Sequence, residues 1–307
     1  MKFWLGVTDN GWYDFLAGRG LDEVNFWQPS ASPPFTKAPT GMPFLFKLKR
    51  PNNHIAGGGF FVTYSTLPIA LAWEVFGEKN GAATLEDLRR LLGPLTGNRR
   101  DGEIGCTVLA NPFFLDKASW IKDPAGWASN IVRGKMYESG SRDGEGIWHA
   151  IASRFRPDQY SEQVPAAAVA EAQAKYGLPV LVKPRLGQSS FRVLVTDAYK
   201  RRCAITGENT LLALEAAHIV PYANEGSHDV RNGLLLRADF HRLFDVGLVG
   251  VTPDLRIRIS PRIREAYFNG KAYYRMNDQQ LSVVPDLAYL RPDPDRLNWH
   301  LQNRFQA

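Results

Sequence analysis

The feature that most constrains this chain is the stretch from residue 211 to residue 245, where three polar residues stand at fixed intervals in an apolar frame. His218 lies in the run LLALEAAHIV, and Asn232 and His241 lie in NGLLLRADFHRLFD, at spacings of 14 and 9 residues. Short apolar runs separated by a polar loop predict two strands, at 211–220 and 233–236, and the pattern at 238–244 predicts a helix. The stretch therefore predicts a strand–loop–strand–helix unit. We also predict a helix over 191–202 before it and strands at 248–251 and 255–259 after it.

Charge is distributed unevenly around this unit. Residues 183–202 and 256–275 each carry six basic groups against one acid, whereas residues 203–255 hold three arginines and seven acids. An acidic centre suits a bound cation, and basic arms on either side suit phosphate groups. The reading of these runs as ordinary solvated surface stays open on charge alone.

The texts LEAAHIVPY and NGLLLRADFHRLFD, in this order, resemble the HNH endonuclease family and its ββα-metal fold. The resemblance implies hydrolysis of a phosphodiester in double-stranded DNA with one divalent metal ion, Mg²⁺ or Mn²⁺. It makes His218 the general base, a role that neutral imidazole suits near pH 7. Asn232 would hold that imidazole through a side-chain or backbone contact, and His241 would begin the metal ligand set. The residues expected to contact the DNA backbone are Lys200, Arg201, Arg202, Arg256 and Arg258.

Two further ligand candidates follow from spacing. Asp245 lies four residues after His241, so both side chains project from the same face of the predicted helix. Many family members carry a metal ligand immediately before the base, but that position is Ala217 here. Glu215, two residues earlier on the strand, shares the face of position 217 and is the candidate replacement, directly or through water. Capping or ion-pairing roles for Asp245 and Glu215 stay open.

Other polar residues of this region are expected to have no part in the chemistry. Many family members bind a structural zinc through two CxxC pairs, but Cys203 stands alone, so we expect no structural zinc and a buried small residue there. His228 lies in a polar loop and is expected to be solvated.

Residues 1–140 are rich in aromatic side chains and short apolar runs. We predict strands at 3–7, 44–48, 58–64 and 106–109 and helices at 68–78 and 84–92, which is an α+β pattern with a small curved sheet or barrel. The texts FWLGVT (3–8), EVNFW (23–27), GMPFLFKL (41–48), IAGGGFFVTY (55–64) and NPFFL (111–115) resemble PUA-like domains of the EVE and YTH types. That resemblance implies the reading of a flipped modified base, in our expectation a cytosine. The candidate walls and polar reader are Trp27, Trp120, Phe113, Tyr64 and Asn25, with core packing as the alternative for each.

We therefore expect three parts: a base-recognition domain (1–140), a connector (141–187) with a helix at 165–176, and an HNH endonuclease domain (188–307). No apolar run reaches 18 residues and no signal peptide is recognisable, which predicts no membrane association. Two distant cysteines, Cys106 and Cys203, argue against a disulfide framework, so we expect a cytoplasmic protein. One active site per chain suggests a homodimer for double-strand cleavage.

The leading hypothesis is a modification-dependent restriction endonuclease. The alternatives are an HNH nuclease of conventional sequence specificity or of the toxin type, and a catalytically degenerate protein that only binds nucleic acid. Ala217 in place of a ligand motivates the last.

Overall fold

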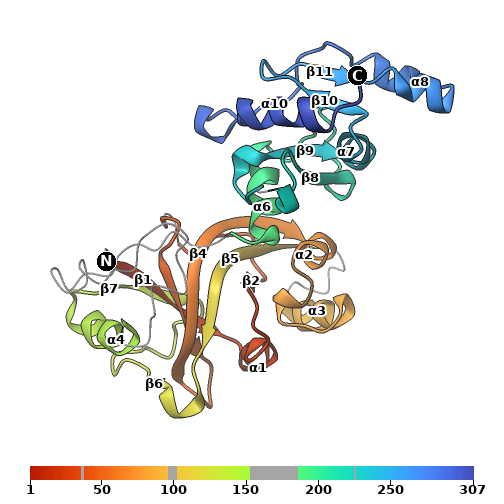
Figure 1. Cartoon of the computed structure of the whole chain (residues 1–307). Helices are drawn as coiled ribbons and strands as arrows, with labels where there is room; N and C mark the ends of the chain where they lie inside the picture. Colours follow the sequence, from red (N-terminus) through yellow and green to blue (C-terminus); the bar gives the residue numbers. More distant parts are fainter. Residues whose placement is uncertain (36–37, 96–101, 153–185, 225) are drawn as a thin grey trace. The chain divides into compact units, whose positions relative to one another are not determined.

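The computed structural model describes residues 1–35, 38–95, 102–152, 186–224 and 226–307 (Figure 1). The chain divides into two units, Met1–Gly187 and Gln188–Ala307. The helix predicted at 165–176 lies outside the described residues. Among those residues, no helix is long and apolar enough to cross a bilayer.

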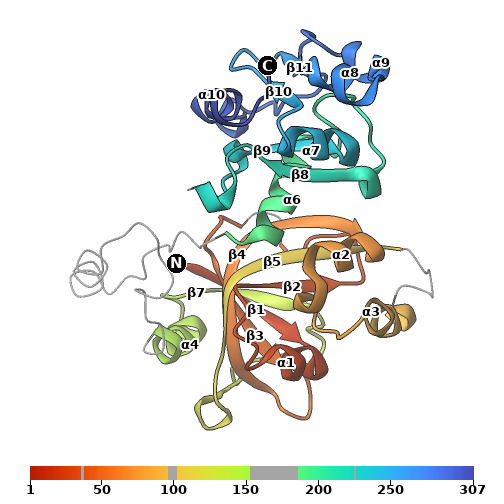
Figure 2. The ribbon, with the colours of Figure 1, turned by 45° about the vertical axis from the view of Figure 1, so that its right-hand side comes forward.

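The first unit is built on a mixed seven-stranded sheet in the order β2-β5-β4-β3-β1-β7, with β6 paired to β4. Strands β1 and β3 run parallel, and the other pairs are antiparallel. Figure 2 shows β4 and β5 curving together along their length. The strands are β1 (Lys2–Thr8), β2 (Glu23–Gln28), β3 (Pro43–Leu48), β4 (His54–Pro68), β5 (Glu103–Phe114), β6 (Ile121–Lys122) and β7 (Gly134–Glu138). The helices are α1 (Asn10–Leu16), α2 (Ile69–Phe76), η1 (Gly77–Asn80), α3 (Leu85–Leu92), η2 (Gly93–Leu95), η3 (Lys117–Ser119) and α4 (Arg142–Ala152).

The four strands predicted in this unit are all present, and β4 and β5 extend well beyond the predicted bounds. The helix predicted at 84–92 is confirmed with its cap, because the Thr84 side chain accepts a hydrogen bond from the backbone of Asp87. The helix predicted at 68–78 is shorter. It begins after Pro68 and ends before Gly77, whose φ of 50° is unfavourable for residues with a side chain.

The glycine run at 57–59 lies inside β4, between β3 and β5. A Cβ on Gly57 would stand 2.2 Å from the carbonyl oxygen of Phe113, and one on Gly58 would stand 2.6 Å from that of Phe44. The run therefore serves the close approach of three strands, and it has none of the strand–helix setting of a phosphate-binding loop.

Both faces of this sheet are buried, and adjacent residues serve different faces. Phe3 and Leu5 belong to one apolar cluster, together with Leu45 of β3. Trp4 belongs to a second cluster, together with Phe44 and Phe46. Because side chains alternate along a strand, this arrangement explains continuous aromatic runs without an alternating polar residue.

The second unit begins with α6 (Gln188–Ala198) and continues through the antiparallel strands β8 (Leu214–His218) and β9 (Gly233–Arg237) into α7 (Ala238–Asp245). The predicted order strand–loop–strand–helix is confirmed. The helix predicted over 191–202 ends earlier, because Lys200 and Arg201 take left-handed φ values of 53° and 58°. The remaining elements are η5 (Leu211–Ala213), η6 (Tyr222–Asn224), η7 (Val230–Asn232), β10 (Val249–Val251), β11 (Ile257–Ile259), α8 (Arg262–Tyr267), α9 (Lys271–Tyr274), η8 (Ala288–Leu290) and α10 (Pro294–Asn303).

One contact fixes α10 against α7. The ring of His300 stacks on Phe244 with centroids 3.8 Å apart, and its Nε2 lies 3.1 Å from the Phe244 carbonyl oxygen as the donor. Its Nδ1 is buried without a hydrogen-bond partner among the described residues. Burial lowers the pKa of His300 to about 4, so the folded protein holds this ring neutral.

This contact predicts acid sensitivity. Because the pKa of His300 is lower in the folded state than its ordinary value of 6.5, its contribution is fully present above pH 6.5 and is lost as the pH falls towards 4. Between pH 7.5 and 4.5 we expect a loss of about 2–3 kcal/mol in the free energy of unfolding from this residue. Urea unfolding of wild type and His300→Phe at both pH values measures it. The variant should lose that part of the pH dependence, whereas the exposed His149→Phe should keep it; equal pH dependence in wild type and His300→Phe would contradict the assignment.

Candidate active site

The β8–β9 pair and α7 set the positions of the three signature residues. His218 at the end of β8 pairs with Gly233 at the start of β9, so the two ends of the intervening loop lie side by side. A Cβ on Gly233 would stand 2.4 Å from Val195 and 3.0 Å from the Phe191 ring. Glycine after Asn232 therefore lets α6 pack directly on the hairpin.

Asn232 closes the loop between the two strands. It is fully buried, and its Oδ1 accepts a hydrogen bond of 2.9 Å from the Val220 N–H. Its Nδ2 donates to the carbonyl oxygens of Val220 and Ser227, both at 2.9 Å. These bonds hold backbone on both sides of the loop. Of the two contacts expected for Asn232, side-chain or backbone, the structure has the backbone one: Asn232 bonds to Val220, two residues after His218.

His218 stacks on Phe191, with ring centroids 3.9 Å apart and an interplanar angle of 12°. Burial first, and then the nearby His228 and His241, lower the pKa of His218 to about 4. The ring is therefore neutral at pH 7 and able to accept a proton.

His228 is the residue of this site that the sequence did not indicate. It was expected to be solvated, but its Nδ1 lies 3.2 Å from Nε2 of His218, and its ring stacks on Tyr222 at 4.9 Å. The polar composition of the loop gave no signal for this contact, because it depends on where Asn232 fastens the loop.

His241 lies between two carboxylates. Its Nδ1 is 2.6 Å from Oε2 of Glu215 on β8, and its Nε2 is 3.4 Å from Oδ2 of Asp245, one turn along α7. Burial raises the pKa of Asp245, an effect that His241 and Arg304 oppose and that Glu215 reinforces. Ala217 is fully buried, and Glu215 faces the ring of His241 on the side opposite Asp245.

The resemblance to HNH endonucleases implies a divalent metal ion, and the donor atoms of His241 and Asp245 determine whether such an ion fits here. Among the described residues no ready-made group of three or more His, Cys, Asp or Glu side chains surrounds a cation position. The Nε2–Oδ2 separation of 3.4 Å is nevertheless close to the roughly 3 Å between neighbouring ligands on an octahedral Mg²⁺. An imidazole nitrogen and a carboxylate oxygen suit Mg²⁺ or Mn²⁺. A carboxylate on the other ring nitrogen is the usual partner of a metal-binding histidine. Nε2 of His241 and Oδ2 of Asp245 therefore fit such an ion, and Glu215 contacts the other ring nitrogen of His241.

The basic residues expected at the DNA backbone are mostly engaged within the protein. Lys200 is 2.8 Å from Asp286, Arg201 is 3.8 Å from Asp197, and Arg256 is 3.2 Å from Asp254. Arg202 donates to the Gly207 carbonyl at 3.1 Å, and Arg258 is exposed. Exposed ion pairs of this kind are weak enough for a phosphate to replace the carboxylate.

The five expected base-binding residues do not form one cage. Asn25 is fully buried and donates to Asn80 at 2.9 Å, and the indole N–H of Trp27 donates to the Asn80 carbonyl at 2.8 Å. In the strand register, Trp27 lies opposite Cys106 of β5, and Tyr64 lies opposite the next residue, Thr107. Because adjacent residues of a strand point to opposite faces, Trp27 and Tyr64 project from opposite faces of β5.

The other two candidates lie elsewhere in the unit. The indole N–H of Trp120 donates to the Leu115 carbonyl at 3.0 Å, and its ring meets Tyr13 edge-on at 6.0 Å. Phe113 lies over Gly58 and packs against the apolar cluster of Phe3 and Leu5.

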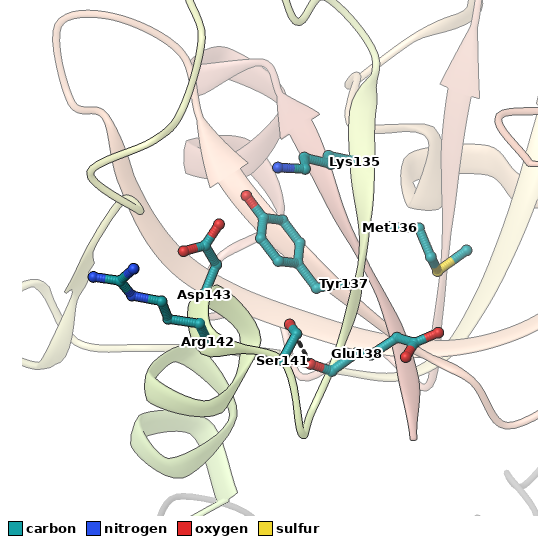
Figure 3. Close-up of a pocket in the computed structure, with 7 residues that line it drawn as sticks. All are labelled: Lys135, Met136, Tyr137, Glu138, Ser141, Arg142 and Asp143. Atoms are coloured by element: carbon teal, nitrogen blue, oxygen red, sulfur yellow. Dashed lines mark hydrogen bonds between the residues drawn. The ribbon is translucent and has the colours of Figure 1, made fainter.

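A pocket of about 550 Å³ opens elsewhere in the first unit, between β7 and the start of α4 (Figure 3). Figure 3 shows the hydroxyl of Tyr137 directed towards Lys135 and Asp143. None of the five candidates lines it; its lining residues are Lys135, Met136, Tyr137, Glu138, Ser141, Arg142 and Asp143. The pocket carries charges of both signs, and the ring of Tyr137 already stacks on Phe3. A base would therefore find no pair of aromatic faces to stack between in this pocket.

Comparison with known proteins supports the resemblance of the C-terminal unit. Residues 203–252 match a family model described as HNH endonuclease. The chain thus carries an HNH endonuclease domain near its C-terminus, and the predicted α+β class is confirmed. A search of curated proteins found no match.

Two solved structures are similar to this chain. One is a point mutant of the ZmASCH protein from Zymomonas mobilis, with 8% identity and a TM-score of 0.31; the match covers 48% of this chain and 97% of the other chain. The other is described as the modification dependent TagI restriction endonuclease, with 13% identity and a TM-score of 0.28. This match covers 96% of this chain and 80% of the other chain.

The hydrogen bonds of Asn232 predict a specific cost for a small change. Asn232→Asp replaces the donating Nδ2 by an oxygen that faces the carbonyls of Val220 and Ser227. We expect the free energy of unfolding to fall by about 2–4 kcal/mol, because two buried acceptors lose their donor. Asn303→Asp is the control, because its amide makes one exposed bond to Trp299, and it should cost less than about 1 kcal/mol. Urea unfolding near neutral pH measures both variants, and equal costs would contradict the role of Asn232.

Proposed function

We propose that the C-terminal unit is a divalent-metal-dependent DNA endonuclease. The observation that carries the proposal is the convergence of Glu215, His241 and Asp245 through contacts of 2.6 and 3.4 Å, with the half-buried His218 on the same strand as Glu215. Metal-assisted phosphodiester hydrolysis requires a base and a set of metal ligands. This site offers an imidazole base, a nitrogen–oxygen donor pair, and a carboxylate that hydrogen-bonds to the ligand imidazole.

Each residue has a separate part in this chemistry. His241 and Asp245 hold the cation, which when bound polarises the phosphate and stabilises charge on the leaving oxygen. Glu215 accepts the Nδ1 proton of His241 and so leaves Nε2 as the donor atom. His218, neutral because it is buried, accepts the proton of the attacking water. Glu215 thus orients the metal ligand His241 by a hydrogen bond. It does not itself bind the metal in place of the ligand that is missing at Ala217.

Cleavage and metal binding provide the test. We expect His218→Ala to abolish cleavage of plasmid DNA with Mn²⁺ while Mn²⁺ affinity stays within about twofold, because the base is not a ligand. Asp245→Asn and His241→Ala should abolish cleavage and weaken Mn²⁺ binding at least about tenfold, and Glu215→Gln should weaken it about 10- to 100-fold. Calorimetric titration measures the affinities, with Asp254→Asn as a control at an exposed carboxylate that pairs with Arg256. Unchanged Mn²⁺ affinity in His241→Ala would refute the ligand set, and DNA binding without any cleavage by wild type would refute the nuclease.

We also propose that the first unit selects DNA by a modified cytosine. Residues 1–182 carry a net charge of only about +1, against +6 for the chain, so this region is a poor non-specific DNA binder. Its contribution then depends on a specific contact with a base. The resemblance to PUA-like base readers is the second support.

The face of the sheet that carries Tyr64 offers one place for that contact. The Thr107 hydroxyl and the Trp4 indole N–H are both buried, and neither has a hydrogen-bond partner among the described residues. Tyr64, the cross-strand neighbour of Thr107, packs against the apolar cluster that contains Trp4. Two unpaired polar atoms beside aromatic rings offer hydrogen bonds to a base edge.

Base reading is measured by competition binding of the full chain, in EDTA, to matched oligonucleotides with and without cytosine modification. Thr107→Val keeps the shape of the side chain and removes the hydroxyl, so we expect it to reduce the preference about 3- to 10-fold without loss of stability. Trp27→Phe, which keeps an aromatic ring packed against the same apolar cluster, should leave the preference unchanged. The reverse pattern would place the reader on the Trp27 face. Equal wild-type affinity for methylated, hydroxymethylated, glucosylated and plain DNA would exclude base reading and leave the nuclease standing.

A further inference from the structure

His228 contacts the proposed base directly. Its Nδ1 lies 3.2 Å from Nε2 of His218, the two rings stand at 60°, and their centroids are 5.2 Å apart. At this distance and with two ring nitrogens facing each other, one of them carries the hydrogen and the other accepts it.

The surroundings hold both rings in place. Phe191 stacks on His218 at 3.9 Å, and Tyr222 stacks on His228 at 4.9 Å with an interplanar angle of 14°. The backbone just before His228 is fixed as well, because the Ser227 carbonyl accepts a hydrogen bond from Asn232 at 2.9 Å. The same Asn232 side chain holds Val220, two residues after His218. One buried amide therefore sets the spacing between the segments that carry the two histidines.

We propose that His228 is a positioning residue: its Nδ1 accepts the Nε2 proton of His218 and so leaves Nδ1 of His218 as the basic atom. This inference rests on the proposed function, in which His218 is the base. In the reverse arrangement, a proton from His228 would occupy the Nε2 lone pair of His218 and the proton of the neutral ring would sit on Nδ1. No nitrogen would then be left to accept a proton from water.

The contact also favours the protonated state that forms during the reaction. When Nδ1 of His218 takes the proton of water, the ring becomes a cation whose Nε2–H still points at His228. A hydrogen bond from a charged donor is roughly twice as strong as a neutral one, so the contact strengthens as the proton arrives. Among the described residues, the titratable neighbours of the pair include His241, which disfavours charge on His218, and Tyr222 against the ring of His228.

Three variants of the full chain separate hydrogen bonding from packing. His228→Phe keeps a ring for Tyr222 to stack on and removes the acceptor, and His228→Asn keeps a polar group near the Nδ1 position. His149→Phe, on the exposed face of α4, is the matched control. We expect kcat for Mn²⁺-dependent plasmid cleavage to fall about 10- to 100-fold in His228→Phe and less in His228→Asn. KM and DNA affinity should stay unchanged in both.

A second measurement does not depend on activity. In ¹⁵N-histidine NMR spectra of the metal-free protein, assigned by the loss of signals in His218→Gln, His218 should be the Nε2–H tautomer. A Nδ1–H tautomer of His218 in wild type would overturn the inference even if no DNA substrate is found or His228→Phe does not fold. Wild-type kcat in a folded His228→Phe would overturn it as well. If His218→Ala is inactive in the same experiment, the nuclease proposal survives that failure.

Discussion

The buried amide of Asn232 is the interaction on which the site depends. Its three hydrogen bonds hold the backbone at Val220, two residues after His218, and at Ser227, the residue before His228. A buried amide with its groups paired to backbone is costly to replace, because each backbone group left alone keeps its desolvation cost. The middle residue of the His–Asn–His pattern therefore has a structural role, and it acts on His218 through the backbone.

A second constraint acts on His241. His241 offers two nitrogens, and the hairpin supplies a carboxylate to one while its own helix supplies a carboxylate to the other. Glu215 comes from β8 and Asp245 from α7, so the geometry exists only when the helix packs on the hairpin. Burial raises the pKa of Asp245, and the nearby Glu215 adds to that effect, so a positive charge close to this carboxylate would favour its ionised form.

The first unit shows how a sheet buried on both faces changes the meaning of aromatic residues. Neighbouring positions on β5, Cys106 and Thr107, face opposite sides, so aromatic residues that are close in sequence or across a pair of strands are separated by the sheet. Trp27 and Trp120 use their N–H groups on backbone carbonyls, as buried tryptophans of a core do. The indole N–H of Trp4 and the hydroxyl of Thr107, by contrast, are buried without a hydrogen-bond partner among the described residues.

The sequence alone determined the α+β class, the order of strands and helix around His218, Asn232 and His241, the cap at Thr84 and the proximity of His241 to Asp245. All of these depend on local periodicity or on short separations along one element, which residue types and spacing express directly. Only the tertiary structure decided that Glu215 faces the ring of His241, that His228 meets His218, and that Tyr64 and Trp27 lie on opposite faces. Those contacts depend on strand register, on the path of a loop and on bulges in a sheet, and a one-residue shift in any of them changes the partner without changing the local pattern.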